Sequence, residues 1–390
     1  MQSERREGSP DRLMPMSKLS LDALLIVFWI FVAAVPLAAQ QPAAAGASQQ
    51  EPNDPQLEHR PPPKPQGAPS AITAEGQIHL DIVVTDAAGK PVAGLEPWDF
   101  KLLDNNQPRK ILSFDGEAVK PDPPVEVILV LDMANLPFQQ VAFVRSEVDQ
   151  FLRAREGHLR QPVTIAQLTS LGIRIQPRPS VDGNALAGVV DQIKGGISTI
   201  NSAMGGEGFV ERFQTSLHAL SNLAENEARK PGRKLLIWVG PGWPMLERPK
   251  EGSPDRAQSL NFGGIVEFST RLREARMVLY SVAPAGTPYS FVYRDFLKGV
   301  QSPRQASSGN LALKVLVTQT GGQILGPDND LAGQIDRCIA DANVFYRISF
   351  NPQPALHADE YHDLSLQVDK PGMTVRTSTG FYDQPNGNRE

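Results

Sequence analysis

The hydrophobic pattern divides the chain into three stretches. Residues 77–118 alternate apolar and polar positions, which is typical of half-buried strands. Residues 125–343 instead alternate short, wholly apolar runs with segments of helical spacing, which predicts buried parallel strands connected by helices. After residue 343 the alternation returns, with Leu364, Leu366 and Val368 at alternate positions. The pattern therefore predicts an α/β domain that is inserted in, or flanked by, a small antiparallel β domain.

The first and last stretches should form that β domain together. Ile78, Leu80, Ile82 and Val84 would share one face of a strand, and the stretch that contains them is too short for a sandwich of its own. We therefore expect the C-terminal strands (344–385) to pair with the N-terminal β segment (73–120).

The middle stretch, residues 123–343, predicts a doubly wound, mostly parallel six-stranded sheet of the Rossmann-like kind. Gly205 to Gly208 read as a glycine-rich loop before a long helix that ends near Glu227, and residues 284–307 are irregular. The strands are expected at 125–131, 162–169, 172–176, 234–239, 276–282 and 321–326, and the other helices at 138–154, 183–194, 260–275, 308–319 and 329–342.

The N-terminus predicts export. Residues 23–39 are apolar and uncharged, follow Arg12 and Lys18, and end in small residues, which is the order found in a signal peptide over residues 1–39. The apolar run also approaches the roughly 20 residues of a membrane span, so an uncleaved anchor is the alternative. Residues 40–72 are rich in Pro, Ala and Gln and predict a disordered linker. We therefore expect a periplasmic, cell-envelope or secreted protein, with membrane contact only through the N-terminal segment.

Composition argues against nucleic-acid binding and against a fold that depends on disulfides or a Cys-rich zinc site. The sequence contains 38 Lys and Arg residues and 43 Asp and Glu residues, and a net charge of -5 without a basic cluster argues against nucleic acid as a partner. The single cysteine, Cys338, can form neither an intrachain disulfide nor a Cys-rich zinc site. We expect Cys338 to be a small buried residue of a helix.

Four stretches of the sequence carry a resemblance to a known family. They are DIVVTDAAGKPVAGLEPWDFKLLDNNQP, ILVLDMANLP, GRKLLIWVGPGWP, and TGGQILGPDNDLAGQI followed by FYRISFNP and KPGMTVRTSTGFY. In this order they make residues 79–382 similar to the VWFA-related domain family described from acidobacteria. Residues 125–341 within them resemble a von Willebrand factor A-type (VWA-type) domain. The resemblance implies the fold, whereas the biochemical role of the family is mostly not established.

The resemblance also raises the question of a metal. VWA-type domains often bind a divalent cation through an Asp-x-Ser-x-Ser motif, a Thr and a second Asp, because hard cations need several oxygen ligands. Here Asp132 stands at the first Asp, but Ala134 and Leu136 stand at the two Ser positions. Pro241 stands at the second Asp.

Other oxygens near the expected site are few. No Thr occurs at Gly205 to Gly208, and Asn135 and Glu207 lie off the motif spacing. We therefore expect a degenerate metal-ion-dependent adhesion site and no obligatory cofactor. Binding of Mg²⁺ or another divalent cation at Asp132 is the alternative. A purely structural interpretation is that Asp132 has a capping or hydrogen-bonding role after the buried strand.

The loops that follow the parallel strands should still meet along one edge of the sheet. Phe138, Trp243, Pro241 and Pro244 would make this edge apolar and aromatic, as interface hot spots often are. An alternative for Trp243 is simple packing beneath its own loop. The predicted ligand-binding rim consists of Asp132, Asn135, Phe138, Glu207, Pro241 and Trp243.

Catalytic motifs are missing from the sequence. It contains no G-x-S-x-G, H-E-x-x-H, Walker A or G-x-G-x-x-G pattern. His357 and His362 flank Asp359 and Glu360, but the stretch is polar and predicts a solvated turn rather than a metal site.

These observations predict an exported, non-enzymatic module that binds a protein or a cell-surface ligand without needing a metal. The alternatives are a structural component of the envelope, metal-dependent adhesion through a non-standard site at Asp132, and an envelope hydrolase whose site is assembled from distant residues.

Overall fold

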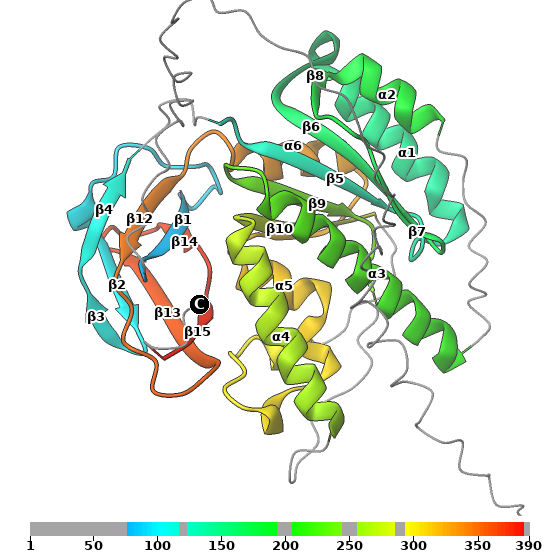
Figure 1. The fold of residues 1–390 in the computed structure, drawn as a ribbon. Coiled ribbons are helices and arrows are strands. Elements are labelled where there is room, and N and C mark those ends of the chain that lie inside the picture. Colours follow the sequence, from blue (N-terminus) through cyan, green and yellow to red (C-terminus); the bar gives the residue numbers. More distant parts are fainter. Residues whose placement is uncertain (1–75, 117–122, 193–204, 244–255, 285–292, 386–390) are drawn as a thin grey trace, which may run out of the picture. The chain divides into compact units, whose positions relative to one another are not determined.

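The computed structural model describes residues 76–116, 123–192, 205–243, 256–284 and 293–385, and shows a helix-covered central sheet next to a smaller β domain (Figure 1). The expected signal segment (1–39) and linker (40–72) lie outside the described residues, as does Pro244. Within the described residues, no helix is both long and apolar enough to cross a membrane.

The central sheet has seven strands, one more than the sequence pattern predicts. Six follow the order β11-β10-β9-β5-β6-β7, and β8 pairs with β6 beside them. The extra strand is β8, whose three residues are too few to show an alternation. All pairs among β11, β10, β9, β5 and β6 are parallel, whereas β7 and β8 run antiparallel to β6. The strands are β5 (Glu126–Asp132), β6 (His158–Thr169), β7 (Gly172–Ile175), β8 (Ser180–Asp182), β9 (Lys234–Val239), β10 (Met277–Pro284) and β11 (Ile324–Asp328).

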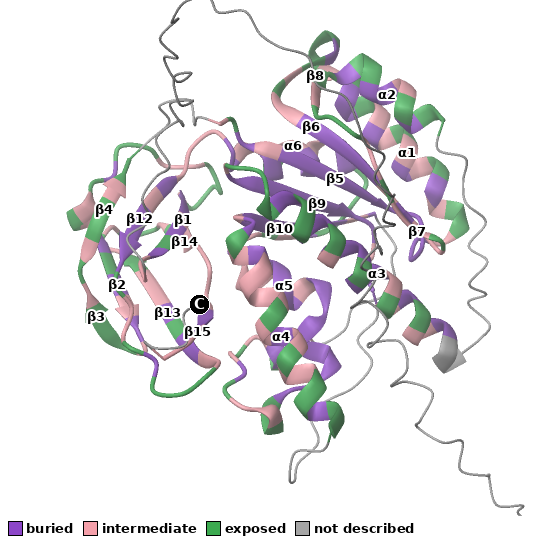
Figure 2. Cartoon of the chain, in the orientation of Figure 1, coloured by how far each residue is buried: buried purple, intermediate pink, exposed green. Residues whose placement is uncertain are grey.

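Helices cover both faces of this sheet, so its central strands are buried on both sides (Figure 2). Along β5, Val127 and Leu129 pack into the core on one face, and Ile128 and Val130 pack into the core on the other. This double burial explains why the strand is apolar at every position. One face is covered by α1 (Phe138–Arg153), α2 (Gly183–Asp191) and α6 (Leu331–Ala340), and the other by α3 (Gly205–Ala228), α4 (Arg256–Glu274) and α5 (Leu313–Gln319).

Two local predictions were wrong. Gly205 to Gly208 form the first turn of α3 rather than a loop before it. The helix predicted over 308–319 is two helices, because Ala312 has an extended ψ of 142° between them. The first of the two is the 3-10 helix η7 (Ser308–Leu311).

The β domain is built from both ends of the described chain. Two four-stranded antiparallel sheets, β14-β1-β12-β4 and β15-β13-β2-β3, enclose one apolar core. The C-terminal strand β12 pairs with β1 and β4, and β13 pairs with β2. Alternate residues of β1, from Ile78 to Val84, enter this core as the sequence pattern predicts. The strands are β1 (Ile78–Thr85), β2 (Phe100–Asp104), β3 (Gln107–Arg109), β4 (Ile111–Asp115), β12 (Tyr346–Phe350), β13 (Glu360–Val368), β14 (Thr374–Arg376) and β15 (Gly380–Asp383).

Ion pairs tie the β domain to the central sheet. Arg276, just before β10, donates to both carboxylate oxygens of Asp81 on β1, at 2.7 and 2.9 Å. Arg376 of β14 donates to the buried carboxylate of Asp341 at 2.9 Å, and Tyr280 of β10 donates to its other oxygen at 2.7 Å. Removing one partner of such a buried pair leaves an uncompensated charge, so these contacts fix how the two parts meet.

Candidate functional site

Asp132 ends strand β5 at the carboxyl edge of the central sheet and is completely buried. Two side chains donate to its carboxylate. Trp238 of β9 donates its indole N–H to Oδ2 at 2.8 Å, and Asn135 donates its amide Nδ2 to Oδ1 and Oδ2 at 2.9 and 3.0 Å. The backbone N–H of Asn135 is a third donor, to Oδ1 at 3.0 Å. The carboxylate is thus held by N–H groups of the protein itself.

Asn135 links this carboxylate to helix α3. Its Nδ2 also lies 3.0 Å from Oγ of the fully buried Ser216, whereas its own Oδ1 is buried and has no hydrogen-bond partner among the described residues. The Asp132 cluster, as we call Asp132, Asn135, Ser216 and Trp238, therefore joins β5, β9 and α3. Neither Ser216 nor Trp238 is part of the predicted site.

The loop after β9 closes over the Asp132 cluster at two glycines. Gly240 has φ 149° and Gly242 has φ 72°, conformations that side chains rarely adopt. A Cβ atom on Gly240 would lie 2.7 Å from Cβ of Asp132, so only glycine fits there. The backbone N–H of Gly242 is a further donor to the Asp132 carboxyl. The GPG sequence therefore packs the loop onto Asp132.

Burial outweighs these hydrogen bonds in the electrostatics of Asp132. Desolvation raises the pKa of its carboxyl to about 6, while the hydrogen bonds from Trp238, Asn135 and Gly242 act in the opposite direction. Among the described residues, no cationic side chain contributes to this balance. The proton is consequently bound more tightly in the folded chain than in an exposed aspartic acid.

The groups around Asp132 do not fit a hard divalent cation. Such an ion needs about six oxygen ligands, and a carboxylate has roughly four lone-pair positions. The Asp132 oxygens accept from Asn135, Trp238 and Gly242, and Ala134 and Leu136, which are buried, carry no oxygen on their side chains. The amide nitrogen of Asn135 contacts both of these oxygens.

Two of the exposed apolar side chains among the described residues, Phe138 and Leu171, lie on this edge. Phe138 is the first residue of α1 and is 70% exposed, and Leu171, in the turn between β6 and β7, is 91% exposed. The backbone N–H of Met133, which follows Asp132, donates to the carbonyl of Leu168 at 2.9 Å, so the two loops are adjacent. Leu171 is not among the residues predicted for the rim. Its place in a turn between two short strands, SLG, gave no periodic signal.

The other predicted rim residues are not brought together at the surface. Trp243 is buried, donates to the carbonyl of Leu311 at 2.8 Å, and meets Trp238 edge to face at 5.1 Å. The structure therefore shows Trp243 packed beneath its loop. Pro241 is half-buried, and Glu207 lies in the first turn of α3.

Two other residues singled out in the sequence are internal. Cys338 is buried in α6, and burial raises the pKa of its thiol far above the usual range. His362 was predicted in a solvated turn, but it is fully buried on β13, with Nδ1 2.9 Å from Oδ1 of Asp104. The histidine faces the core because it continues the alternation of Leu364 on the same strand. His357, in contrast, is exposed.

Comparisons with known proteins give only remote similarities. No protein-family model and no curated protein matches the sequence. Solved structures that share part of the arrangement include the human COPII-coat protein Sec24c, with 10% identity over 67% of this chain and 44% of that one, and a TM-score of 0.31. The pilus adhesin SpaC from Lactobacillus rhamnosus GG has 9% identity over 67% and 44%, with a TM-score of 0.32. Proximal thread matrix protein 1 from the mussel byssus has 13% identity over 56% and 48%, with a TM-score of 0.29. The chain spans less than half of each of these structures, and scores this low assign no function.

Proposed function

We propose that this chain is an exported binding protein built on a VWA-type domain, and that it holds a protein partner without a metal ion. The observation that carries the proposal is the Asp132 carboxylate, which is buried and accepts N–H groups from Asn135 and Trp238 where the resemblance would place a cation. The export segment and the linker before the folded part support the same proposal.

The contact surface on this proposal is the carboxyl edge of the sheet. Phe138 and Leu171 are large apolar side chains that stay mostly in water, on adjacent loops of otherwise buried strands. Burying such side chains against a partner contributes roughly 1.5–3 kcal/mol each. We call this pair the rim pair.

The experiment is affinity capture from an envelope extract, with and without a chelator. The chain with Phe138→Ser and Leu171→Ser should lose a protein that the unaltered chain retains in the presence of EDTA. The matched control carries Val181→Ser and Leu112→Ser. Val181 is also exposed but lies on β8, which pairs with the start of β6 and so with the opposite edge of the sheet.

Two outcomes would count against the proposal. If EDTA abolished capture and Mg²⁺ restored it, the metal-free part would be wrong, and adhesion through a non-standard site at Asp132 would take its place. If the rim variant captured the same protein as the unaltered chain, the contact surface would lie elsewhere, as expected for an envelope component that acts through its β domain.

A further inference from the structure

The described part of a long connection between β10 and α5, residues 293–312, forms one wall of an open cavity. The connection covers residues 285–312, and its described part forms the short helices η5 (Tyr293–Phe296), η6 (Pro303–Gln305) and η7. Connections longer than about 12–15 residues are uncommon in compact domains and are often functional. This one rests on the β domain, where Tyr382 of β15 donates to the carbonyl of Val300 at 2.9 Å.

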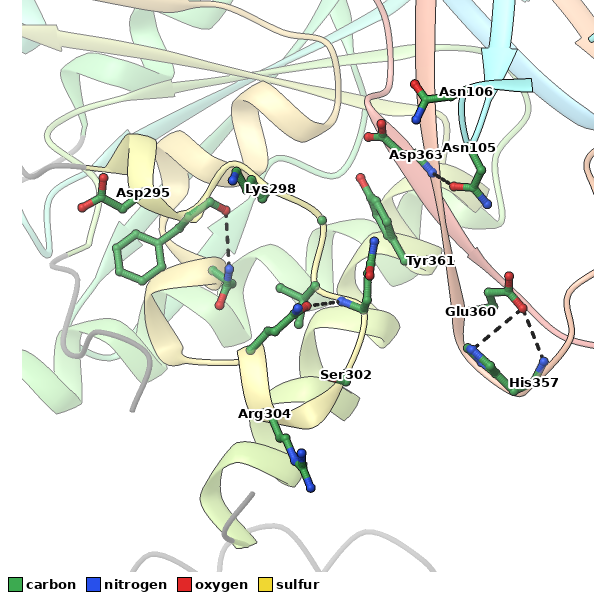
Figure 3. A pocket seen from close by; sticks show the side chains of 16 residues that line it. Asn105, Asn106, Asp295, Lys298, Ser302, Arg304, His357, Glu360, Tyr361 and Asp363 are labelled. Atoms are coloured by element: carbon green, nitrogen blue, oxygen red, sulfur yellow. Dashed lines mark hydrogen bonds and ion pairs between the residues drawn. The ribbon is translucent and has the colours of Figure 1, made fainter. Parts of the chain in front are cut away.

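The cavity lies between this connection and the β domain (Figure 3). Its volume is about 1170 Å³, and it is open to solvent on one side. Small-molecule pockets usually measure about 300–1,000 Å³, so this one has room for a ligand of several linked units. Asn105, Asn106 and Asp363 come from the β domain, and Lys298 and Arg304 come from the connection.

Both walls are held in place by contacts among the residues that line the cavity. Tyr361 of β13 packs so closely on the backbone of Gly299 that a Cβ there would overlap the ring. The side chain of Asn105 accepts from the backbone N–H of Asp363 at 2.9 Å, and the backbone N–H of Asn105 donates to the carbonyl of Asp363 at 2.9 Å. A wall fixed before binding saves the entropy of ordering it.

Several polar side chains in the cavity are not used by the fold. The side chains of Asn106, Lys298, Arg304 and Asp363 make no hydrogen bond or ion pair with another described residue. Asp363 is exposed at the cavity, and partial desolvation together with the charge of Asp104 raises the pKa of its carboxyl. A ligand that donates to this carboxylate would offset that cost.

The mixture of groups indicates the chemistry of the ligand. The acidic Asp295, Glu360 and Asp363 are nearly balanced by Lys298 and Arg304, so the cavity does not favour a strongly charged molecule. Five side-chain amides lie among the lining residues, and an amide can both donate and accept. The oxygens of three of them, Asn105, Gln305 and Asn310, already accept backbone N–H groups, which leaves the N–H groups of Asn105 and Gln305 and the whole Asn106 amide among the groups that a ligand could meet. The hydroxyl groups of a ligand likewise donate and accept. A planar amide or carboxylate can form two hydrogen bonds at once, one with each of two neighbouring hydroxyl groups. We propose that the cavity binds a neutral oligosaccharide.

This second site goes beyond the proposed function and does not depend on the rim pair. Asn105 and Asp363 belong to the β domain, whereas Phe138 and Leu171 belong to loops of the central sheet. Serine at both rim positions should therefore leave saccharide binding unchanged, which separates a failure of one proposal from a failure of the other.

The test is a screen of the full chain on an array of neutral and charged glycans, followed by calorimetric titration with the neutral oligosaccharide that binds best. Asp363→Asn removes the uncommitted charge, and Asn106→Gly removes an amide while suiting the positive φ of 63° at that position. Each change should weaken binding at least tenfold. The matched control is Asp115→Asn, an exposed carboxylate of the β domain outside the cavity, which should bind like the unaltered chain.

Saturable binding of a neutral glycan that persists at high salt and is weakened by both cavity variants supports the proposal. Salt screening weakens the binding of charged ligands far more than that of neutral ligands. The proposal is overturned if no neutral glycan binds, if both cavity variants bind normally while their unfolding midpoints are unchanged, or if binding is limited to acidic glycans or peptides and is lost in salt.

Discussion

The buried Asp132 carboxyl should make the chain more stable as the pH falls towards 5. Its pKa is raised to about 6 in the folded chain, against 3.8 for an exposed aspartic acid. Between these two values the folded chain binds more protons than the unfolded chain. The contribution of Asp132 to the free energy of unfolding therefore increases as the pH falls through 6, and is complete below 3.8.

The size of the effect follows from the shift. The difference between 6 and 3.8 is 2.2 pH units, which corresponds to about 3 kcal/mol in full. The part of it gained between about pH 7 and pH 5 is about 1 kcal/mol. Asp81 and Asp104 act in the opposite direction, because their folded-state pKa values are lowered and their contributions are lost as the pH falls through those lowered values.

Urea unfolding of the unaltered chain and of Asp132→Asn, monitored by tryptophan fluorescence, isolates the contribution of Asp132 to the free energy of unfolding. The amide changes the hydrogen bonds to Trp238 and Asn135 by an amount that does not vary with pH. The difference between the two unfolding free energies should therefore change by about 1 kcal/mol in favour of the unaltered chain from pH 7 to pH 5. A difference that stays constant over this range, or moves the other way, would refute the reasoning. Selective stabilisation of the unaltered chain by Mg²⁺ would instead show that a cation reaches Asp132.

Three further outcomes follow from buried groups. The thiol of Cys338 should resist iodoacetamide in the folded chain and react after unfolding, because it is buried and its pKa is raised; rapid labelling of the folded chain would contradict its burial. Asp104→Ala should lower the free energy of unfolding by about 2–4 kcal/mol, and Asp104→Asn by less, since the amide oxygen can still accept from His362. Equal losses in the two variants would show that this hydrogen bond is unimportant. Arg376→Met should cost about 3 kcal/mol in the same measurement because it leaves the Asp341 carboxylate buried without its cation, and a loss below about 1 kcal/mol would mean that water reaches Asp341.

Strands buried on both faces were the easiest elements to predict from the sequence. Strand β5 is apolar from Val127 to Leu131 because helices pack on each side, and the same holds for β9. Strand β8 was missed because its three residues carry no period. Gly205 to Gly208 were read as a loop from glycine propensity alone, whereas in the structure they begin the long helix α3.

The site was harder to predict, since its partners are distant in sequence. The end of an apolar strand identifies Asp132, but Ser216 lies 81 residues from Asn135 and Trp238 lies 106 residues from Asp132. Trp238 sits in an apolar strand and gives no sign of a polar partner. The cavity wall around Asp363 is equally hidden, because its amides come from separate turns and the connection at 293–312 has no period.

The Asp132 cluster shows how N–H groups of the protein can hold an acidic residue at the edge of a sheet. Burying an unpaired carboxylate this deeply would greatly lower the free energy of unfolding. A buried carboxylate is therefore usually compensated by a cation, a proton or several N–H donors. The described residues supply donors from Asn135, Trp238 and Gly242, yet no full positive charge, and the pKa of about 6 reflects that incomplete compensation. Because the donors come from the loop after β5, from β9 and from the loop after β9, they also bind these elements together. On this account Asp132 organises the loops of the edge from inside, and on the proposed function a partner would contact the rim pair, Phe138 and Leu171, which the same loops hold in the solvent.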